Sequence, residues 1–365
     1  GAPERRTAGP ASPRVARRQG QRRLHDMPDA VGTVERAGGE VPFRHPPRSE
    51  RASYRLRFGA QRFWDLTVYP KAIFPWSPEY GGRPLSALTK NHIFRLKFIG
   101  TIHVLALGAP FCFSWGAFRI FLITMAIASF GMTASFHRQC SHRSFACPKW
   151  LEYTFALMGC QALEGAPIGW ARIHRYHHVH SDKEHDVHSP VDGVLWSHVG
   201  HLFDPTTSDK LDLFDETCPS NVADLQKQAF YRLLDNATVY AWLSVWLPVA
   251  ALFALGGLPY VIWGFCLRVV WVWHVTWSIN SFGHICGYQS YRSGDNSMNN
   301  HLLGILGFGD GYHNNHHAFP SSARHGFEWY ETDVTWWVLW SLSKVGLVWN
   351  LRLPTVAQRR RRAIA

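Results

Sequence analysis

The sequence predicts an all-α integral membrane protein whose four transmembrane helices form two hairpins, with a helical cap on the cytoplasmic side. Three observations support this fold class. Four apolar stretches each approach the ~20 residues that cross a bilayer as a helix. Positive charge gathers at the two ends of the chain rather than along it. Histidines gather in short clusters that follow the apolar stretches.

The N-terminal region, residues 1–62, carries 14 Arg against 6 acidic residues, which gives a net charge of +8. It offers little apolar surface to offset the entropy of ordering, so we expect a basic, disordered extension. Its first 26 residues are Arg-rich, as in a transit peptide, but they contain little serine. The alternative is that translation starts at Met27 and that the preceding residues are an extension of the gene model.

Residues 63–350 are expected to form the membrane domain. They open with a stretch that contains Trp and Tyr, side chains that favour the bilayer interface. The connections within each pair of apolar stretches are very short and nearly uncharged, so each pair predicts a helical hairpin. The four expected spans are about 96–115, 117–136, 238–257 and 259–280.

Charge predicts the orientation of these spans. The N-terminal region, the segment between the hairpins and a basic C-terminal tail, 351–365, would all lie on one side of the membrane. Because Lys and Arg favour the inner side, we expect that side to be cytoplasmic, or stromal in a plastid. The apolar spans favour a membrane over nucleic acid as the partner of the basic ends. A soluble protein with four buried helices would not explain the paired spans.

Two features qualify this topology. A fifth apolar stretch, 150–170, contains two acidic residues, glycines and a proline, so we expect one helix that lies near the cytoplasmic surface rather than one that spans the bilayer. Arg268 falls inside the fourth expected span and must therefore face protein or a water-filled groove.

The seven cysteines form no CxxC pair, which argues against a cysteine-bound zinc.

Four histidine clusters lie on the expected cytoplasmic side. Two of them read HxxHH, and positions i, i+3 and i+4 share one helix face, so we expect each to point three imidazoles at one place. Asn280 and His284 are also four residues apart. The first cluster, HxxxxH, is off-face on a straight helix, so its members meet only if the helix ends between them, or else they serve two groups. The clustered histidines are His137, His142, His174, His177, His178, His284, His313, His316 and His317.

These nine imidazoles suit a transition metal such as iron, zinc or copper. Four to six ligands saturate one ion, so the number fits two ions with four or five nitrogens each. Repeated reduction of O2 would favour iron over redox-inert zinc. Metal-bound histidines commonly donate their second N–H to a carboxylate. The candidates for that role are Asp182, Glu184, Asp186 and Asp310.

The remaining histidines fall into two groups. Isolated histidines are usually surface or hydrogen-bonded core residues, and this interpretation applies to His25, His45, His92, His103, His274, His301 and His325. The histidines that follow the second cluster are either partners of metal ligands or members of a solvated loop. They are His180, His185, His188, His198 and His201.

The four clusters resemble the histidine boxes of membrane-bound fatty acyl desaturases, and most closely those of the Δ9 (stearoyl-type) branch. The matching segments are HRQCSHRSF, HRYHHVHSDKEHDVHSP, NSFGHICG and GYHNNHHAFP, and the resemblance covers about residues 60–345. It implies four membrane spans, a cytoplasmic cap and a di-iron centre bound by the nine histidines. It also implies that Asn280 holds a water near one iron.

The resemblance implies O2-dependent insertion of a cis double bond into a saturated acyl chain. Removing hydrogen from an unactivated methylene is beyond any side-chain acid or base, so the cofactor would carry that step. Two electrons would come from a separate donor, ferredoxin or cytochrome b5, since the sequence contains no His-Pro-Gly-Gly haem-binding motif of a fused haem module.

Departures from the family pattern bear on the substrate. Acyl-CoA members carry a basic pair after a SHVGW-like segment, where the pair meets the CoA phosphates. This chain reads SHVGHLFDP instead, with Asp204 and Pro205 at that point. Arg172 matches an arginine that contacts the headgroup, but Ile173 replaces the acidic residue beside it. A lipid-linked acyl substrate is therefore favoured over acyl-CoA.

Two other function classes share parts of the pattern. A di-iron hydroxylase or monooxygenase would use the same oxidant and the same number of ligands, although the HxxxxH cluster and the Asn280–His284 pair favour a desaturase. A non-catalytic metal-binding or transport protein would need polar groups along a path through its spans, and these spans are mostly apolar.

Overall fold

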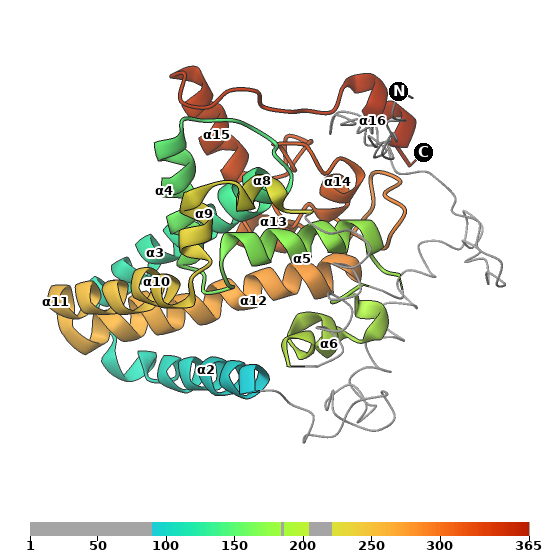
Figure 1. Cartoon of the computed structure of the whole chain (residues 1–365). Coiled ribbons are helices and arrows are strands. Elements are labelled where there is room, and N and C mark those ends of the chain that lie inside the picture. The colour runs from blue at the N-terminus through green and yellow to red at the C-terminus, as the bar shows by residue number, and fades with distance from the viewer. Residues whose placement is uncertain (1–89, 184–185, 204–220, 365) are drawn as a thin grey trace, which may run out of the picture. The chain divides into compact units, whose positions relative to one another are not determined.

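The computed structural model describes residues 90–183, 186–203 and 221–364 (Figure 1). The expected extension at 1–62 lies outside them. The described residues are helical, and their only β-type pairings are isolated bridges, in agreement with the all-α prediction. The α-helices are α2 (Lys90–Ala106), α3 (Trp115–Phe130), α4 (Lys149–Cys160), α5 (Pro167–His180), α6 (Val194–His198), α8 (Ala223–Gln226), α9 (Ala229–Leu234), α10 (Ala237–Ala241), α11 (Leu247–Val261), α12 (Arg268–Ser281), α13 (His301–Leu306), α14 (His313–Ala318), α15 (Val334–Lys344) and α16 (Val356–Arg362).

Shorter or wider helical segments connect several of these helices. The π-helices are η6 (Gly131–Ser141), η9 (Trp242–Trp246) and η10 (Ile262–Leu267). The 3₁₀ segments are η5 (Ala109–Cys112), η7 (Pro190–Asp192), η8 (Gly200–Leu202) and η11 (Phe282–His284).

Two helical runs in the described residues are long and apolar enough to cross a membrane. The run Trp115–Ser141 contains the second expected span, and the run Ala237–His284 contains the third and fourth. The longer run breaks at Gly256 and Gly257, where Gly257 has a φ of +64° that glycine adopts easily. Leu252 and Phe265, from either side of the break, share one buried apolar cluster, so the run folds back as a hairpin.

The first expected span differs from the prediction. Its helix, α2, begins earlier than expected and ends at Ala106, and the chain continues through Gly108 into η5, which contains Pro110. Pro110 has no N–H to donate to the carbonyl of Ala106, and its ring would clash with that carbonyl in an α-helix, which accounts for the early end. The topology of four spans, and the side of the membrane on which the cap lies, remain predictions.

Arg268 faces the protein interior, as expected. Its side chain is 2 % exposed, and its guanidinium donates to the backbone carbonyls of Gly264 and Gln161. The neutral oxygens of two backbone segments thus replace water around this charge.

The stretch 150–170 forms two helices rather than one. A turn with positive φ at Leu163 and Gly165 separates α4 from α5, and Pro167 opens α5 at a position where its missing N–H costs nothing. Near its C-terminal end, α4 crosses η6 so closely that a Cβ on Gly131 of η6 would lie 2.1 Å from the backbone nitrogen of Gly159 of α4. This glycine contact brings η6 close to α4.

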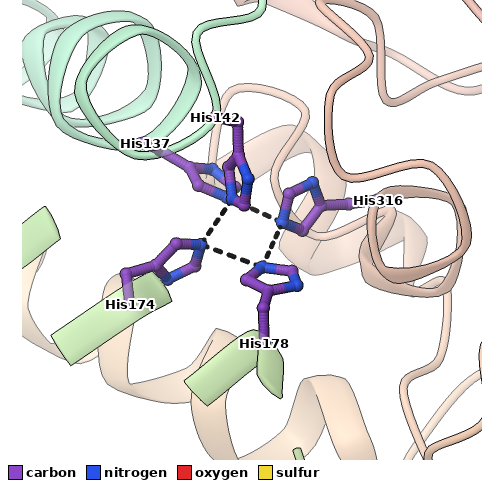
Figure 2. Close-up of side chains that lie close together, drawn as sticks. All are labelled: His137, His142, His174, His178 and His316. Carbon is purple, nitrogen blue, oxygen red and sulfur yellow. Dashed lines mark hydrogen bonds between the residues drawn. The ribbon is translucent and has the colours of Figure 1, made fainter. Parts of the chain in front are cut away.

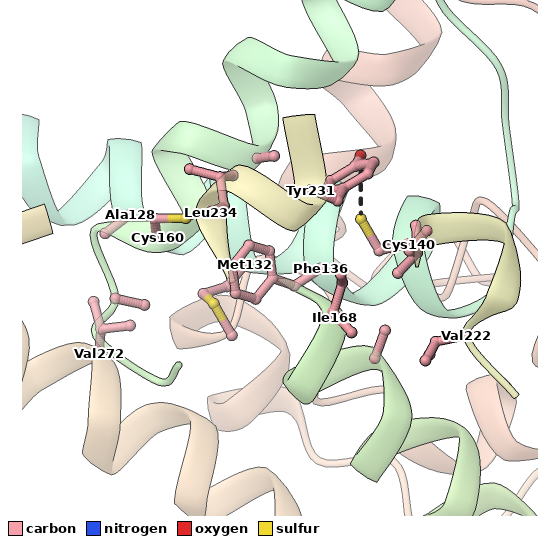
Figure 3. Close-up of a cluster of buried hydrophobic side chains, with 14 residues drawn as sticks. Ala128, Met132, Phe136, Cys140, Cys160, Ile168, Val222, Tyr231, Leu234 and Val272 are labelled. Atoms are coloured by element: carbon pink, nitrogen blue, oxygen red, sulfur yellow. Dashed lines mark hydrogen bonds between the residues drawn. The ribbon is translucent and has the colours of Figure 1, made fainter. Parts of the chain in front are cut away.

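A buried apolar cluster fixes η6 and α5 relative to each other (Figure 3). Met132 and Phe136 from η6 pack with Ile168 from α5, Leu234 from α9 and Val272 from α12. The histidine-bearing parts of η6 and α5 also come together, since Nε2 of His142, the C-cap of η6, lies 2.9 Å from Nε2 of His174 on α5. The expected basic tail 351–365 is also structured, since its residues Val356–Arg362 form α16.

Candidate metal centre

Five of the nine clustered histidines meet at one point (Figure 2). One ring nitrogen from each lies within 4.8 Å of the others. Neighbouring Nε2 atoms are 2.8–3.0 Å apart around the group. The members are His137 and His142 from η6 and its C-cap, His174 and His178 from α5, and His316 from α14.

The other four histidines form a second, buried group. A ring nitrogen from each again lies within 4.8 Å of the others, and the rings of His313 and His317 are 4.3 Å apart. The two groups are neighbours, because the ring centroids of His178 and His317 are separated by 4.4 Å. The members are His177 from α5, His284 from η11, and His313 and His317 from α14.

The structure divides each HxxHH cluster between the two groups instead of keeping it together. His174 and His178 join the five-histidine group, whereas His177 joins the four-histidine group. Adjacent residues on a helix are roughly 100° apart, so His177 and His178 point in different directions. In α14 the division is the reverse, with His313 and His317 in the smaller group and His316 in the larger.

The HxxxxH cluster meets because its helix is a π-helix. The backbone N–H of His142 donates to the carbonyl of His137, an i to i−5 bond of 3.2 Å. This wider turn aligns residues five apart, and both side chains reach the same group. The helix does end at Ser141, between the two, as one of the expected alternatives required.

Each group receives carboxylates on the ring nitrogens that face away from its centre. Asp310 lies 2.7 Å from Nδ1 of His137 in the larger group. In the smaller group Nδ1 of His177 donates to Asp186 at 3.0 Å, and Nδ1 of His284 donates to Asp182 at 2.8 Å. These contacts place the ring proton on Nδ1 and leave the lone pair of Nε2 free to bind a metal ion.

Asp295 supplies a further carboxylate, 2.5 Å from Nδ1 of His317, that sequence reasoning missed. It lies in the loop between the third and fourth clusters, and no local spacing marks it. His325, interpreted as an ordinary histidine, is fully buried with Nδ1 3.1 Å from Asp310. The ring centroids of His188 and His177 are 4.3 Å apart, with the rings tilted at 34° to each other, and His188 is buried beside Asp186.

Other expected site residues have less contact with the two groups. Asn280 is half-buried on α12, one turn before His284. Arg172 is half-buried on α5, and its carbonyl accepts from Asn221. His198 bonds Ser281 and His274, and His201 bonds the carbonyl of Trp196. Glu184 and His185 lie outside the described residues.

The donor atoms fit metal ions. The Nε2 atoms of His177, His284 and His317 are buried and have no hydrogen-bond partner in the described structure. Two imidazole nitrogens that each lie about 2.1 Å from one ion, at right angles to each other, are about 3 Å apart. The neighbouring Nε2 atoms of the larger group have this separation. Burial, then nearby imidazoles, hold the pKa values of His174, His178, His313 and His316 well below the ordinary value, so these rings are neutral, the form in which an imidazole can bind a metal ion.

A small cavity borders the five-histidine group. His137 and Asp310 form part of its wall, and Trp170 adds an indole that stacks on His174 with 4.8 Å between ring centroids. The rest of the lining comes from the two long apolar runs and the loop before α14: Ser129, Met132, Thr133, Val272, Val275, Thr276, Ile279 and Gly307. An apolar chain inserted here would lie beside the larger group.

Comparison with known proteins shows the family. The sequence model of the fatty acid desaturase family matches residues 113–352, which include all nine clustered histidines. A chloroplastic palmitoyl-monogalactosyldiacylglycerol delta-7 desaturase of Arabidopsis thaliana is 47 % identical over 269 residues, or 72 % of this chain and 69 % of the relative.

Two further relatives extend the comparison. Icosanoyl-CoA 5-desaturase of Limnanthes douglasii is 46 % identical over 327 residues, or 88 % of this chain and 87 % of the relative. Delta-9 acyl-lipid desaturase 1 of Arabidopsis thaliana is 41 % identical over 265 residues, or 72 % of this chain and 84 % of the relative. This chain therefore belongs to the fatty acid desaturase family and is an oxidoreductase of that family.

Proposed function

We propose that this chain binds two iron ions, one at each histidine group, and inserts a cis double bond at carbon 9 of a saturated, lipid-linked acyl chain. The observation that carries the proposal is the division of nine histidines into neighbouring groups of five and four beside an apolar cavity. In the overall reaction one –CH₂–CH₂– unit, one O2, two protons and two electrons give one –CH=CH– unit and two waters.

The residues have distinct parts in this reaction. When bound, the iron supplies the oxidising power that abstraction of hydrogen from a methylene requires. The neutral imidazoles hold it. The ring protons are held on Nδ1 by four carboxylates, those of Asp310, Asp186, Asp182 and Asp295.

The substrate is placed by the cavity lining. Its apolar side chains, which include Met132, Val272 and Ile279, exclude water and place the acyl chain beside His137. Asn280 would hold a water, and Arg172 would contact the headgroup.

Two observations bear on the choice of substrate. The lack of the basic pair of acyl-CoA enzymes after SHVGH supports a lipid-linked substrate. The names of the relatives do not choose between the two carriers: two of those described above are named for acyl-lipid substrates. The third is named for an acyl-CoA, so the same scaffold serves both carriers. We place the enzyme in a membrane with the metal centre on the cytoplasmic or stromal side, where a separate donor, ferredoxin or cytochrome b5, reaches it.

The experiment is fatty-acid analysis by gas chromatography of cells that express the chain in a host without Δ9 activity. The double bond is located chemically and the lipid classes are separated. A new monoene at carbon 9 in glycerolipids is the expected result, and it should be absent with the variant His316→Ala. A hydroxylated acyl chain would replace the proposal by the hydroxylase alternative, and a monoene confined to acyl-CoA would contradict the lipid-linked substrate.

A further inference from the structure

The C-terminal helix α16 presents two opposite faces of arginine. Its sequence VAQRRRR places four arginines at successive positions, and Thr355 and Gln358 start the helix with a complete capping box. Arg359 and Arg362, one turn apart, are half-buried, whereas Arg360 and Arg361 are exposed. The helix therefore uses two of its arginines for packing and leaves two in solvent.

The inward arginines attach α16 to the helix that carries the fourth histidine cluster. Arg362 donates to the carbonyl of Ala318, the residue directly after His317, and its guanidinium lies over the ring of Phe319 at 5.5 Å. Arg359 pairs with Glu328 at 2.8 Å and lies over the ring of Phe327 at 4.9 Å. The path from the guanidinium of Arg362 to the backbone of His317 is therefore one hydrogen bond and one residue, Ala318.

The backbone reinforces this attachment. The N–H of Arg292 donates to the carbonyl of Arg362, and Tyr291 and Ala363 form an antiparallel bridge. These contacts hold the loop that contains Asp295, whose carboxylate bonds His317. These contacts therefore hold α16 against α14 and against the loop that contains Asp295.

The surface around α16 is basic. Arg292 and Arg352 are exposed on adjoining segments and add to the charge of Arg360 and Arg361. The nearby acid Glu328 is already paired with Arg359, and Asp295 is largely buried against His317. Exposed arginines that no acidic side chain of the described residues neutralises attract acidic proteins over distances of about 10 Å at moderate salt.

We propose that α16 is the docking surface for the electron donor, a soluble one-electron carrier protein with an acidic face. The proposal rests on the proposed function, because only a reaction that consumes external electrons needs such a partner. Each turnover takes two electrons, so two reduced carriers dock in succession and leave oxidised, and the electrons end in the water formed from O2. Electron transfer rates fall steeply with distance, which favours a docking site attached directly to the metal-binding helix.

An anionic membrane surface is the alternative partner of these arginines. Figure 1 places α16 on the opposite side of the described bundle from the hairpin end of α11. On the exposed face of α16 the arginines lie beside Val356, which is 65 % exposed, and Ala357, so this face carries one large apolar side chain and no continuous apolar surface that would enter a bilayer. The position and composition of α16 therefore favour a protein carrier.

The test uses the full chain, loaded with iron, in nanodiscs of zwitterionic lipid. The variant Arg360→Glu/Arg361→Glu reverses the exposed charges, and Lys227→Glu/Arg232→Glu, an exposed basic pair on and before α9, is the matched control. Desaturation is followed with reduced ferredoxin, with reduced cytochrome b5, and in a single turnover with dithionite and a small mediator. The expected result is a KM for the carrier raised at least tenfold, weaker salt dependence of turnover and an unchanged yield with dithionite, while the control pair behaves as the unmodified chain.

Other outcomes decide against the proposal. An unchanged KM for both carriers overturns it. A loss of product with dithionite as well would mean that the substitutions damage the site. An effect that appears only in nanodiscs of anionic lipid would assign the arginines to the membrane surface. No product from the unmodified chain with any reductant would instead overturn the proposed function, and the docking surface with it.

Discussion

The carboxylate of Asp295 lies 2.5 Å from Nδ1 of His317, and both side chains are almost entirely enclosed. The aspartate also accepts hydrogen bonds from Ser293 and from the hydroxyl and N–H of Ser297. Burial alone would raise the pKa of Asp295, but its interaction with His317 and these hydrogen bonds keep the pKa well below its ordinary value. A single loop residue thus fixes the proton of one histidine of the four-histidine group.

Removing this carboxylate should weaken one metal position and spare the other. In Asp295→Ala, Nδ1 of His317 loses its partner and the ring can change tautomer, so we expect metal affinity or activity to fall by about 10–100-fold. The iron content of the purified protein should fall toward half of the unmodified value. The exposed Asp235 gives a control, Asp235→Ala. Full iron content and activity in Asp295→Ala would show that the contact has no role in metal binding.

One histidine from each group tests the division of ligands. His316→Ala removes a nitrogen from the five-histidine group and His177→Ala removes one from the four-histidine group. We expect both variants to remain in the membrane and to lose activity, because both ions are needed. His301→Ala, an exposed histidine outside both groups, should leave activity unchanged. Activity retained in both cluster variants would contradict the ligand assignment.

Sequence patterns predicted the helical class and the position of the second hairpin well. Apolar length locates a buried or membrane helix, and Gly256, Gly257 and Pro259 mark the break inside the long run. The end of α2 was harder to predict, because Leu107–Gly116 remains apolar while Gly108 and Pro110 end the helix. Hydropathy averages over such local backbone effects.

The candidate site could be predicted where the spacing of residues along the sequence indicates which side chains gather in one place. The nine histidines were identified from their clusters, but their division into five and four was not, since it depends on how η6, α5 and α14 face one another. The sequence did not predict that η6 is a π-helix, because this form accompanies a tertiary contact between Gly131 and Gly159. Asp295 and His325 join the site only through folding of distant loops.

A buried ion pair beside the site should dominate the effect of one substitution on stability. Arg138 is fully buried and donates to both oxygens of Asp333 at 3.0 and 3.2 Å. Asp333 also caps α15 through the N–H of Trp336. Asp333→Ala would leave the guanidinium with only part of its partners, so we expect a loss of about 3–5 kcal/mol in the free energy of unfolding.

Chemical denaturation in detergent measures that loss. The exposed control Asp235→Ala should change the free energy of unfolding by less than about 0.5 kcal/mol. A similarly small change in Asp333→Ala would mean that water or Asp310 replaces the lost partner of Arg138.

The carboxyl group of Glu164 predicts a pH dependence of stability. It lies beside the cavity wall, where it accepts from the indole N–H of Trp170 at 3.1 Å, and burial raises its pKa to about 7. An unfolded glutamate releases its proton near pH 4.3, so between about pH 4.3 and 7 the folded state binds more protons than the unfolded state. The contribution of Glu164 to stability is therefore full below this window and is lost as the pH rises through it.

The variant Glu164→Gln isolates this effect, because glutamine keeps the shape of the side chain and does not titrate. Thermal unfolding of both proteins between pH 5 and 8, at constant metal content, is the measurement. Other titrating groups contribute equally to both, so the difference between the two curves reports Glu164 alone. We expect the unmodified protein to lose stability relative to the variant by on the order of 1–3 kcal/mol as the pH rises to 8. Parallel curves would show that Glu164 is ionised throughout, and that water or a cation compensates its burial beside Trp170.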